Sequence, residues 1–286
     1  MDGLQDLSQD KRLRNHLNVD KKRRSNHHWQ SSPHFHSYYE MYFMQEGHCK
    51  FFVGESGYPL DKGEILLIPP GELHLCRYEE EGLHDRFTVY FDAERLTPDL
   101  LGYLPFDLSD PKTPVHLKVN PESVDEVIFL LGRMLEAYHM DSEYGERMNA
   151  YLFPVLLLFL STHSRRITGK EMESPVEQAI ERTVRYLGEH YMEPMTLDEA
   201  ASIAGFTPSY FSRKFKEIVG LGFREYLTHL RLKKGANLLR TSHLSVQEIA
   251  DACGFSSANY FGDVFKSMYR LSPRQYRQVD EVSDHL

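Results

Sequence analysis

The sequence lacks the features that mark secreted, disulfide-bonded or membrane-spanning proteins. Its 286 residues include three cysteines, Cys49, Cys76 and Cys253, at spacings that suit neither a disulfide framework nor a zinc knuckle. The longest apolar run, residues 155–160, is far shorter than the roughly 20 residues needed to span a bilayer. The first thirty residues contain no apolar core of a secretion signal. We therefore expect a cytoplasmic protein with no membrane partner, long enough for about two domains.

Two short helices joined by a tight turn are predicted within residues 246–268. Apolar residues recur at helical spacing over 246–252, and Gly254 ends this helix because glycine adopts a left-handed backbone without strain. Ser256 is the expected N-cap of the second helix. Such a pair, with a small polar outer face, is typical of a DNA-binding helix-turn-helix. The second helix is expected to bury four side chains: Tyr260, Phe261, Phe265 and Met268.

The same motif occurs a second time, closer to the N-terminus. Parts of residues 197–206 match residues 246–255 at an offset of 49, and parts of residues 210–216 match residues 260–266 at an offset of 50. A helix is predicted over residues 223–239, between the two copies. At helical rise it spans roughly 26 Å, which suits two recognition helices placed near adjacent major grooves.

The tandem motif resembles the DNA-binding domain of AraC/XylS-type transcriptional regulators. The segments GFSSANYFGDVFK and LSPRQYR are its most specific parts, and the resemblance covers residues 176–278. It implies a sequence-specific regulator that binds a double-stranded DNA operator, contacts RNA polymerase and acts as an activator of a metabolic operon.

The outer faces of the two recognition helices hold the candidate DNA contacts. Arg213 could contact guanine and Asn259 adenine, each with about 1–3 kcal/mol of base discrimination, while Lys216 and Lys266 suit phosphates. Asp263 departs from the family pattern, which has arginine there. It should repel phosphates unless it accepts from cytosine N4 or pairs with a nearby cation. The candidate set is Ser209, Ser212, Arg213 and Lys216 on the first helix and Ala258, Asn259, Asp263 and Lys266 on the second.

Positive charge is scarce for a DNA-binding protein. The net charge is −9. Residues 176–280 carry 14 Lys and Arg against 12 Asp and Glu, whereas the rest of the chain carries 19 against 30. The mildly basic C-terminal part offers few phosphate contacts per protomer, so we expect tight binding to need two protomers on one operator.

The N-terminal half has a different pattern. Residues 1–30 are polar and charged, which predicts a solvated, flexible segment. Short strands punctuated by glycine and proline follow and predict a small barrel or jelly roll. The predicted strands are residues 40–45, 50–53, 64–68 and 87–91.

Two spacings in this half resemble the signatures of the cupin barrel. They are His34-x-His36-x3-Glu40-x6-Gly47 and Gly63-x5-Pro69-x-Gly71-x2-His74. The second signature usually ends in asparagine, where this sequence has Tyr78. Side chains alternate along a strand, so His34, His36 and Glu40 would point to one side, and His74 could join them from a neighbouring strand.

Three roles are open for these four residues. They could bind an organic effector such as a sugar or related metabolite by hydrogen bonds. They could hold a divalent metal, Zn, Ni, Mn or Fe, since metal-dependent cupin enzymes use these positions as ligands. They could also form a purely structural polar cluster. The regulator hypothesis requires no cofactor, and its alternative is a cupin metalloenzyme or metal-sensing regulator that uses His34, His36, Glu40 and His74.

Two helices follow the predicted barrel. Residues 96–117 are expected to form a loop with a strand at 115–117, and helices are predicted over residues 121–138 and 144–162. Members of the resembled family form homodimers through helices of this region. Residues 164–175, polar with glycine and proline, are the expected interdomain linker.

The predicted fold class is therefore α+β. A flexible segment, residues 1–30, precedes a cupin-like barrel with two helices, residues 31–163, and the linker, residues 164–175, leads to an all-α double helix-turn-helix, residues 176–280. We expect a ligand-responsive transcription factor that is not an enzyme. Its small-molecule effector would shift the population between arrangements of the domains or protomers. A ligand-independent DNA-binding scaffold is the remaining hypothesis.

Overall fold

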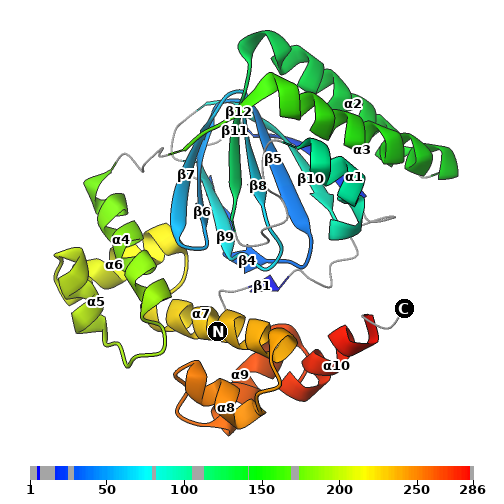
Figure 1. Cartoon of the computed structure of the whole chain (residues 1–286). Coiled ribbons are helices and arrows are strands. Elements are labelled where there is room, and N and C mark those ends of the chain that lie inside the picture. Colours follow the sequence, from blue (N-terminus) through cyan, green and yellow to red (C-terminus); the bar gives the residue numbers. More distant parts are fainter. Residues whose placement is uncertain are drawn as a thin grey trace. The chain divides into compact units, whose positions relative to one another are not determined.

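The computed structural model describes residues 5–6, 17–24, 29–78, 82–104, 113–140, 142–168 and 174–283. The chain divides into two compact units (Figure 1). The β unit comprises residues 7–172, and the helical unit comprises residues 173–286 together with residues 1–6. No helix in the described ranges combines the length and apolar character needed to cross a bilayer.

Two antiparallel sheets form the β unit. The larger sheet has the strand order β12-β11-β8-β5-β10-β2, and the smaller one has the order β4-β9-β6-β7, with β3 also paired to β9. The strands are β2 (Leu17–Arg24), β3 (Trp29–Gln30), β4 (His34–Phe35), β5 (Tyr39–Glu46), β6 (His48–Val53), β7 (Ser56–Asp61), β8 (Glu64–Ile68), β9 (His74–Tyr78), β10 (His84–Phe91), β11 (Val115–Val119) and β12 (Ser164–Arg166).

Alternation along the strands gives the larger sheet two different apolar faces. Met41 and Phe43 of β5 belong to a core shared with the helices that follow the strands. Tyr42 and Met44 belong to a second core, shared with β6 and β9 of the smaller sheet. The second face therefore points into the interior between the two sheets, which we call the β-unit interior.

Helices cover the outer face of the larger sheet. They are η1 (Ala93–Arg95), α1 (Pro98–Tyr103), η2 (Pro121–Ser123), α2 (Val124–His139) and α3 (Glu143–His163). Figure 1 shows α2 and α3 side by side, and their apolar residues Val127, Leu131, Phe153 and Leu157 are buried in the first core. The predicted cupin-like β domain with two helices is confirmed, and it consists of two antiparallel sheets with α2 and α3.

Three predictions about this unit were wrong in part. Residues 17–24, assigned to a flexible segment, form β2, which pairs with β10 along its whole length. Edge pairing uses backbone hydrogen bonds, and only alternate side chains such as Leu17 and Val19 need to be apolar. Residues 98–103 of the expected loop form α1. Residues 164–166 of the expected linker form β12 on the edge strand β11.

The helical unit contains seven helices in its described residues. They are α4 (Pro175–Glu189), α5 (Leu197–Ala204), α6 (Pro208–Val219), α7 (Phe223–Thr241), α8 (Val246–Ala252), α9 (Ala258–Tyr269) and α10 (Pro273–Ser283). The short β1 (Gln5–Asp6) is grouped with this unit. The pairs α5–α6 and α8–α9 are the two predicted helix-turn-helix motifs, and α7 is the helix predicted between them.

The two motifs also share the N-terminal cap and the C-terminal glycine of their first helices, α5 and α8. Thr196 and Glu199 form a capping box on α5, and Ser245 and Glu248 form the same box on α8. In such a box the hydroxyl and the carboxylate satisfy backbone N–H groups that have no helical partner. After each helix a glycine has a φ of 74°. Both turns are therefore encoded locally in the sequence.

Two details of the second motif differ from expectation. The N-cap of α9 is Ser257, whose hydroxyl accepts from the Tyr260 N–H, and not Ser256. Tyr260, expected in the buried stripe, is 50% exposed. It lies about 100° around the helix from the buried Phe261, at the exposed edge of the apolar face.

Candidate functional sites

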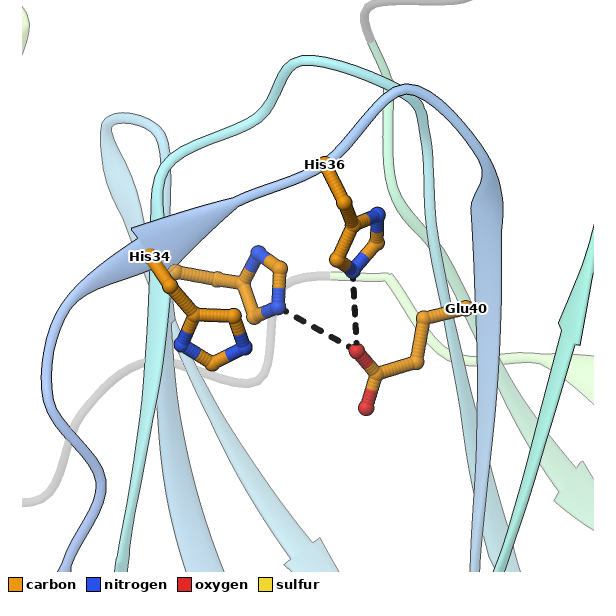
Figure 2. A group of neighbouring side chains, drawn as sticks. His34, His36 and Glu40 are labelled. Carbon is orange, nitrogen blue, oxygen red and sulfur yellow. Dashed lines mark hydrogen bonds and ion pairs between the residues drawn. The ribbon is translucent and has the colours of Figure 1, made fainter. Parts of the chain in front are cut away.

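Three histidines and one carboxylate meet in the β-unit interior. His34 lies on β4 directly opposite His74 on β9, and Glu40 lies on β5 of the other sheet. The Nε2 atoms of His36 and His74 are 3.1 and 3.2 Å from Glu40 Oε2 (Figure 2). One ligand atom from each of the four residues can be chosen so that all lie within 4.8 Å of one another. We call these four residues the histidine cluster.

The route by which these residues meet differs from the prediction. His34 and Glu40 do not share a strand, because β4 ends at Phe35 and β5 begins at Tyr39 in the other sheet. The chain bends between the two strands and carries His36 in the connection. All four predicted residues are brought together, yet by a crossover between sheets and not by the period-two alternation of one strand.

Backbone carbonyls fix the orientation of the rings. His36 Nδ1 donates to the Tyr38 carbonyl at 2.7 Å and His74 Nδ1 donates to the Glu72 carbonyl at 2.8 Å. A neutral imidazole has one N–H, so a hydrogen on Nδ1 leaves Nε2 without a hydrogen and with a lone pair that can only accept. Two nitrogen lone pairs then face the Glu40 carboxylate, and acceptors in such contact need a proton or a cation between them.

Burial sets the charges in the cluster. It lowers the pKa of His36 below its ordinary value and lowers the pKa of His34 to about 3, which keeps both rings neutral near pH 7. The cluster therefore combines imidazole and carboxylate groups, the donor set that divalent transition metals prefer.

Aromatic rings line the same region. Tyr38 stacks on His36 with ring centroids 4.1 Å apart, and Tyr90 of β10 contacts both rings edge-on. Tyr42 also faces the β-unit interior, whereas Tyr39 and Phe43 pack in the core shared with the helices. The polar cluster thus lies beside ring faces on which a sugar or another flat ligand could stack.

The helical unit presents the predicted recognition residues on its surface. Ser209, Ser212, Arg213 and Lys216 of α6 are exposed and line an open groove of about 610 Å³. The Arg213 guanidinium lies 5.4 Å from the ring centroid of Tyr210, which restricts its range of positions.

The second recognition helix is similar in shape and different in charge. Asn259, Asp263 and Lys266 of α9 are exposed, and Ala258 is half-buried. Asp263 makes no ion pair with any residue in the described ranges, so its charge is not cancelled within the protein. Tyr260 adds an exposed ring that sequence reasoning missed. Its counterpart in the repeat, Tyr210, is half-buried, so neither ring lies fully in the core.

Both units match known families. Residues 17–142 match the AraC-like ligand binding domain, and residues 200–279 match a helix-turn-helix domain. The chain belongs to the AraC family of transcriptional regulators. It is a sequence-specific DNA-binding regulator with a ligand-binding domain, as the sequence predicted.

Curated relatives are similar over most of the chain. The transcriptional regulator YijO of Escherichia coli (strain K12) is 28% identical over 225 residues, 78% of this chain and 76% of that protein. The transcriptional activator RhaS of Enterobacter sp. (strain 638) is 25% identical over 253 residues, 87% of this chain and 88% of that protein. Among solved structures, the C-terminal domain of AraT, a response regulator from Geobacillus stearothermophilus, is 33% identical, covers 37% of this chain and 88% of that chain, and has a TM-score of 0.35.

Proposed function

We propose that this regulator is a transcriptional activator of a metabolic operon, and that its effector, a sugar or related metabolite, binds in the β-unit interior beside the histidine cluster. The observation that carries the proposal is the cluster itself. Its four polar side chains converge on one point in the interior and leave lone pairs facing each other, which is costly for a purely structural feature. The similarity to a named activator over 87% of the chain supports the direction of regulation.

The mechanism we propose is a shift of population. An effector that binds one arrangement of the protein better than another shifts the equilibrium by its difference in affinity. That arrangement would place α6 and α9 on successive major grooves of the operator and present the protein to RNA polymerase. Arg213 and Asn259 would read bases, and Lys216 and Lys266 would hold phosphates.

We propose that the operator-bound form is a homodimer assembled through α3. Four large apolar side chains of this helix are exposed to solvent by 38% to 74%: Tyr144, Tyr151, Val155 and Leu158. Their spacings of 7, 4 and 3 residues follow a heptad pattern, so they lie along one stripe suited to helix–helix packing. Val155→Glu should convert a dimer to a monomer in light scattering and weaken operator binding. Met192→Glu, at an exposed apolar position of the helical unit, should leave the dimer intact.

The decisive experiment measures operator affinity with and without effector. The operator is first selected from a random duplex pool with the full chain, and neutral and acidic sugars and divalent metals are screened by thermal unfolding. A ligand at a hundred times its Kd should stabilise the protein by about 2.7 kcal/mol. The proposal expects that ligand to change operator affinity, and His36→Ala to abolish the change. Lys216→Ala should weaken DNA binding and keep the thermal response. Equal operator affinity with and without every ligand would favour the ligand-independent scaffold.

A second candidate is regulation through a bound metal, favoured by the facing lone pairs of the histidine cluster. Ligand bonds of about 2.0–2.2 Å place donor atoms about 3–4 Å apart, so donor atoms within 4.8 Å need little movement. The Nδ1 donors to backbone carbonyls are the usual support of metal-bound imidazoles. His34, His36, His74 and Glu40 would hold the ion, which would supply a Lewis acid for a ligand oxygen.

Metal analysis of the purified full chain separates these candidates. A metal regulator should contain about one Zn, Ni, Mn or Fe per chain and lose it in His74→Ala, with a change in operator affinity on chelation. Full operator response in metal-free protein would exclude this candidate. Stoichiometric metal together with turnover of a small substrate would instead favour the metalloenzyme hypothesis.

A further inference from the structure

Arg86 is a buried arginine in the β-unit interior. It lies on β10 and is 8% exposed. Thr88 and Tyr90, two and four residues further along the strand, share its face because side chains alternate, whereas Phe87 and Val89 pack toward the helices. The guanidinium therefore points between the two sheets, a region otherwise lined by residues of the second apolar core.

Within the described ranges, no carboxylate neutralises this charge. The guanidinium Nη1 donates a hydrogen bond to the Thr88 hydroxyl, and the central guanidinium carbon, Cζ, lies 5.0 Å from the Tyr42 ring centroid. An arginine has five N–H donors and stays protonated in proteins, so most of its donors have no acceptor among these residues. A ring face and a neutral hydroxyl do not replace a counter-ion.

The neighbouring tyrosines do not supply the missing negative charge. The Tyr42 and Tyr78 hydroxyls are hydrogen-bonded to each other beside Arg86. Burial raises the pKa of both groups above the ordinary value, so both stay neutral.

Two other buried charges of this unit, Asp85 and Glu64, are paired. Asp85, next to Arg86 in sequence and 1% exposed, accepts from Arg23 at 2.8 Å. Glu64 lies 3.0 Å from His116 and 3.3 Å from Lys118. The fold thus provides partners for buried charges elsewhere, and the guanidinium is the exception among these groups.

Arg86 and the histidine cluster lie on the same interior face. The strand register places Tyr90 opposite Glu40, Thr88 opposite Tyr42 and Arg86 opposite Met44. Tyr90 lies four residues along the strand from Arg86, roughly 13 Å at the rise of an extended chain. The interior therefore has a histidine pole, formed by the histidine cluster, and an arginine pole, formed by Arg86. The Thr88 and Tyr42 hydroxyls lie between them.

We propose that the effector is an anion, and that its carboxylate or phosphate group binds Arg86 with help from the Thr88 and Tyr42 hydroxyls. The inference rests on the proposed function, since it names the chemical class of the effector. Arginine suits this role because its forked donors match the two oxygens of a carboxylate or phosphate. Sugar acids and sugar phosphates carry both the anionic group and hydroxyls for the histidine pole.

Thermal unfolding of the full chain tests the proposal with defined probes. Wild type, Arg86→Met and Arg133→Met are unfolded in chloride, acetate and phosphate at equal ionic strength, and with glucose, glucuronate and glucose 6-phosphate. Arg133 is a surface residue of α2 paired to Glu136, so its variant loses the same formal charge outside the interior. Phosphate also stabilises proteins by exclusion from their surface, an effect common to all three proteins.

The proposal expects three results. In chloride, Arg86→Met has the same Tm as wild type or a higher one, because an uncompensated buried charge is removed. Acetate or phosphate raises the Tm of wild type and Arg133→Met more than that of Arg86→Met. For a binding sugar acid or sugar phosphate, Arg86→Met weakens the Kd about 10- to 100-fold.

Two results would overturn the proposal. A lower Tm of Arg86→Met in chloride, with an unchanged response to every anion, would mean that Arg86 has a structural counter-ion and would overturn the proposal. If Arg86→Met does not fold, Arg86→Lys takes its place, since it keeps the charge and loses the fork. The anion Kd should then weaken about tenfold, and an unchanged Kd would overturn the proposal.

The same probes separate this inference from the function on which it rests. If neutral glucose changes operator affinity and no anion response depends on Arg86, the regulator is effector-responsive and the anion inference is wrong. If the anion response depends on Arg86 and no probe changes operator affinity, the anion site stands and the effector-responsive function fails. The acetate and phosphate comparison distinguishes a carboxylate from a phosphate effector.

Discussion

Replacing Asp263 by arginine should make DNA binding stronger and more sensitive to salt. Asp263 is exposed on α9, between the candidate base contact Asn259 and the candidate phosphate contact Lys266, and forms no ion pair with a described residue. Its counterpart on α6 is Arg213, also exposed. The wild-type carboxylate would therefore meet the phosphate backbone with its full charge, and an arginine there would add a phosphate contact instead.

The size of the change follows from counterion release. Each added phosphate contact steepens the slope of log K against log salt by about 0.9, or about 1.8 for two protomers on one duplex. Between 50 and 200 mM salt, the affinity of the variant should therefore fall more than that of wild type, by an additional factor of about 3.5 for one added contact or about 12 for two. Removing the repulsion adds about 1 kcal/mol at contact distance in water, roughly fivefold in affinity at low salt.

Fluorescence anisotropy on a scrambled duplex, titrated from 50 to 200 mM KCl, measures both quantities. Asp125→Arg is the matched control, because it makes the same change of net charge at an exposed position on α2 of the β unit. We expect a steeper slope for Asp263→Arg and the wild-type slope for the control. Equal slopes for all three proteins would refute the reasoning and place Asp263 away from phosphates.

Three further predictions concern base recognition, the turn and pH. Arg213→Ala should weaken specific binding by about 1–3 kcal/mol and relax the preference at one base pair of a selected operator. Gly254→Ala should lower the free energy of unfolding in urea by more than Gly205→Ala. Both glycines have a φ of 74°, a backbone conformation that is about 1–2 kcal/mol less favourable for alanine than for glycine. Only at Gly254 would an added Cβ also clash with the Met192 carbonyl oxygen, at 2.5 Å. Because burial lowers the pKa of His34 to about 3 from 6.5, the unfolded state takes up the proton first as pH falls below 6.5. The free energy of unfolding should therefore decline by up to about 1.4 kcal/mol for each unit that the pH falls below 6.5. Urea unfolding from pH 7.5 to 5 should show a shallower decline for His34→Gln than for wild type. Parallel plots of unfolding free energy against pH for the two proteins would contradict this.

The sequence alone was sufficient for the two helix-turn-helix motifs and the helix between them. Capping boxes, turn glycines and helical spacing act within a few residues, so the sequence predicted α5, α6, α8 and α9 with small errors such as the cap at Ser257. Their surface residues followed from helical geometry. Where a single residue step of about 100° decides between core and surface, as at Tyr260, spacing by itself assigned the wrong face.

Tertiary structure decided the β unit and its candidate site. The four residues of the histidine cluster were predicted from a family signature, but their meeting depends on a crossover between two sheets. β2 is held by backbone pairing with β10, which leaves little trace in side-chain pattern. Arg86 carried no sequence signal at all, because the burial of a charge and the absence of a described counter-ion are properties of packing. Local hydrogen bonds are written in neighbouring residues, whereas the interior of a two-sheet fold is assembled from residues far apart in the chain.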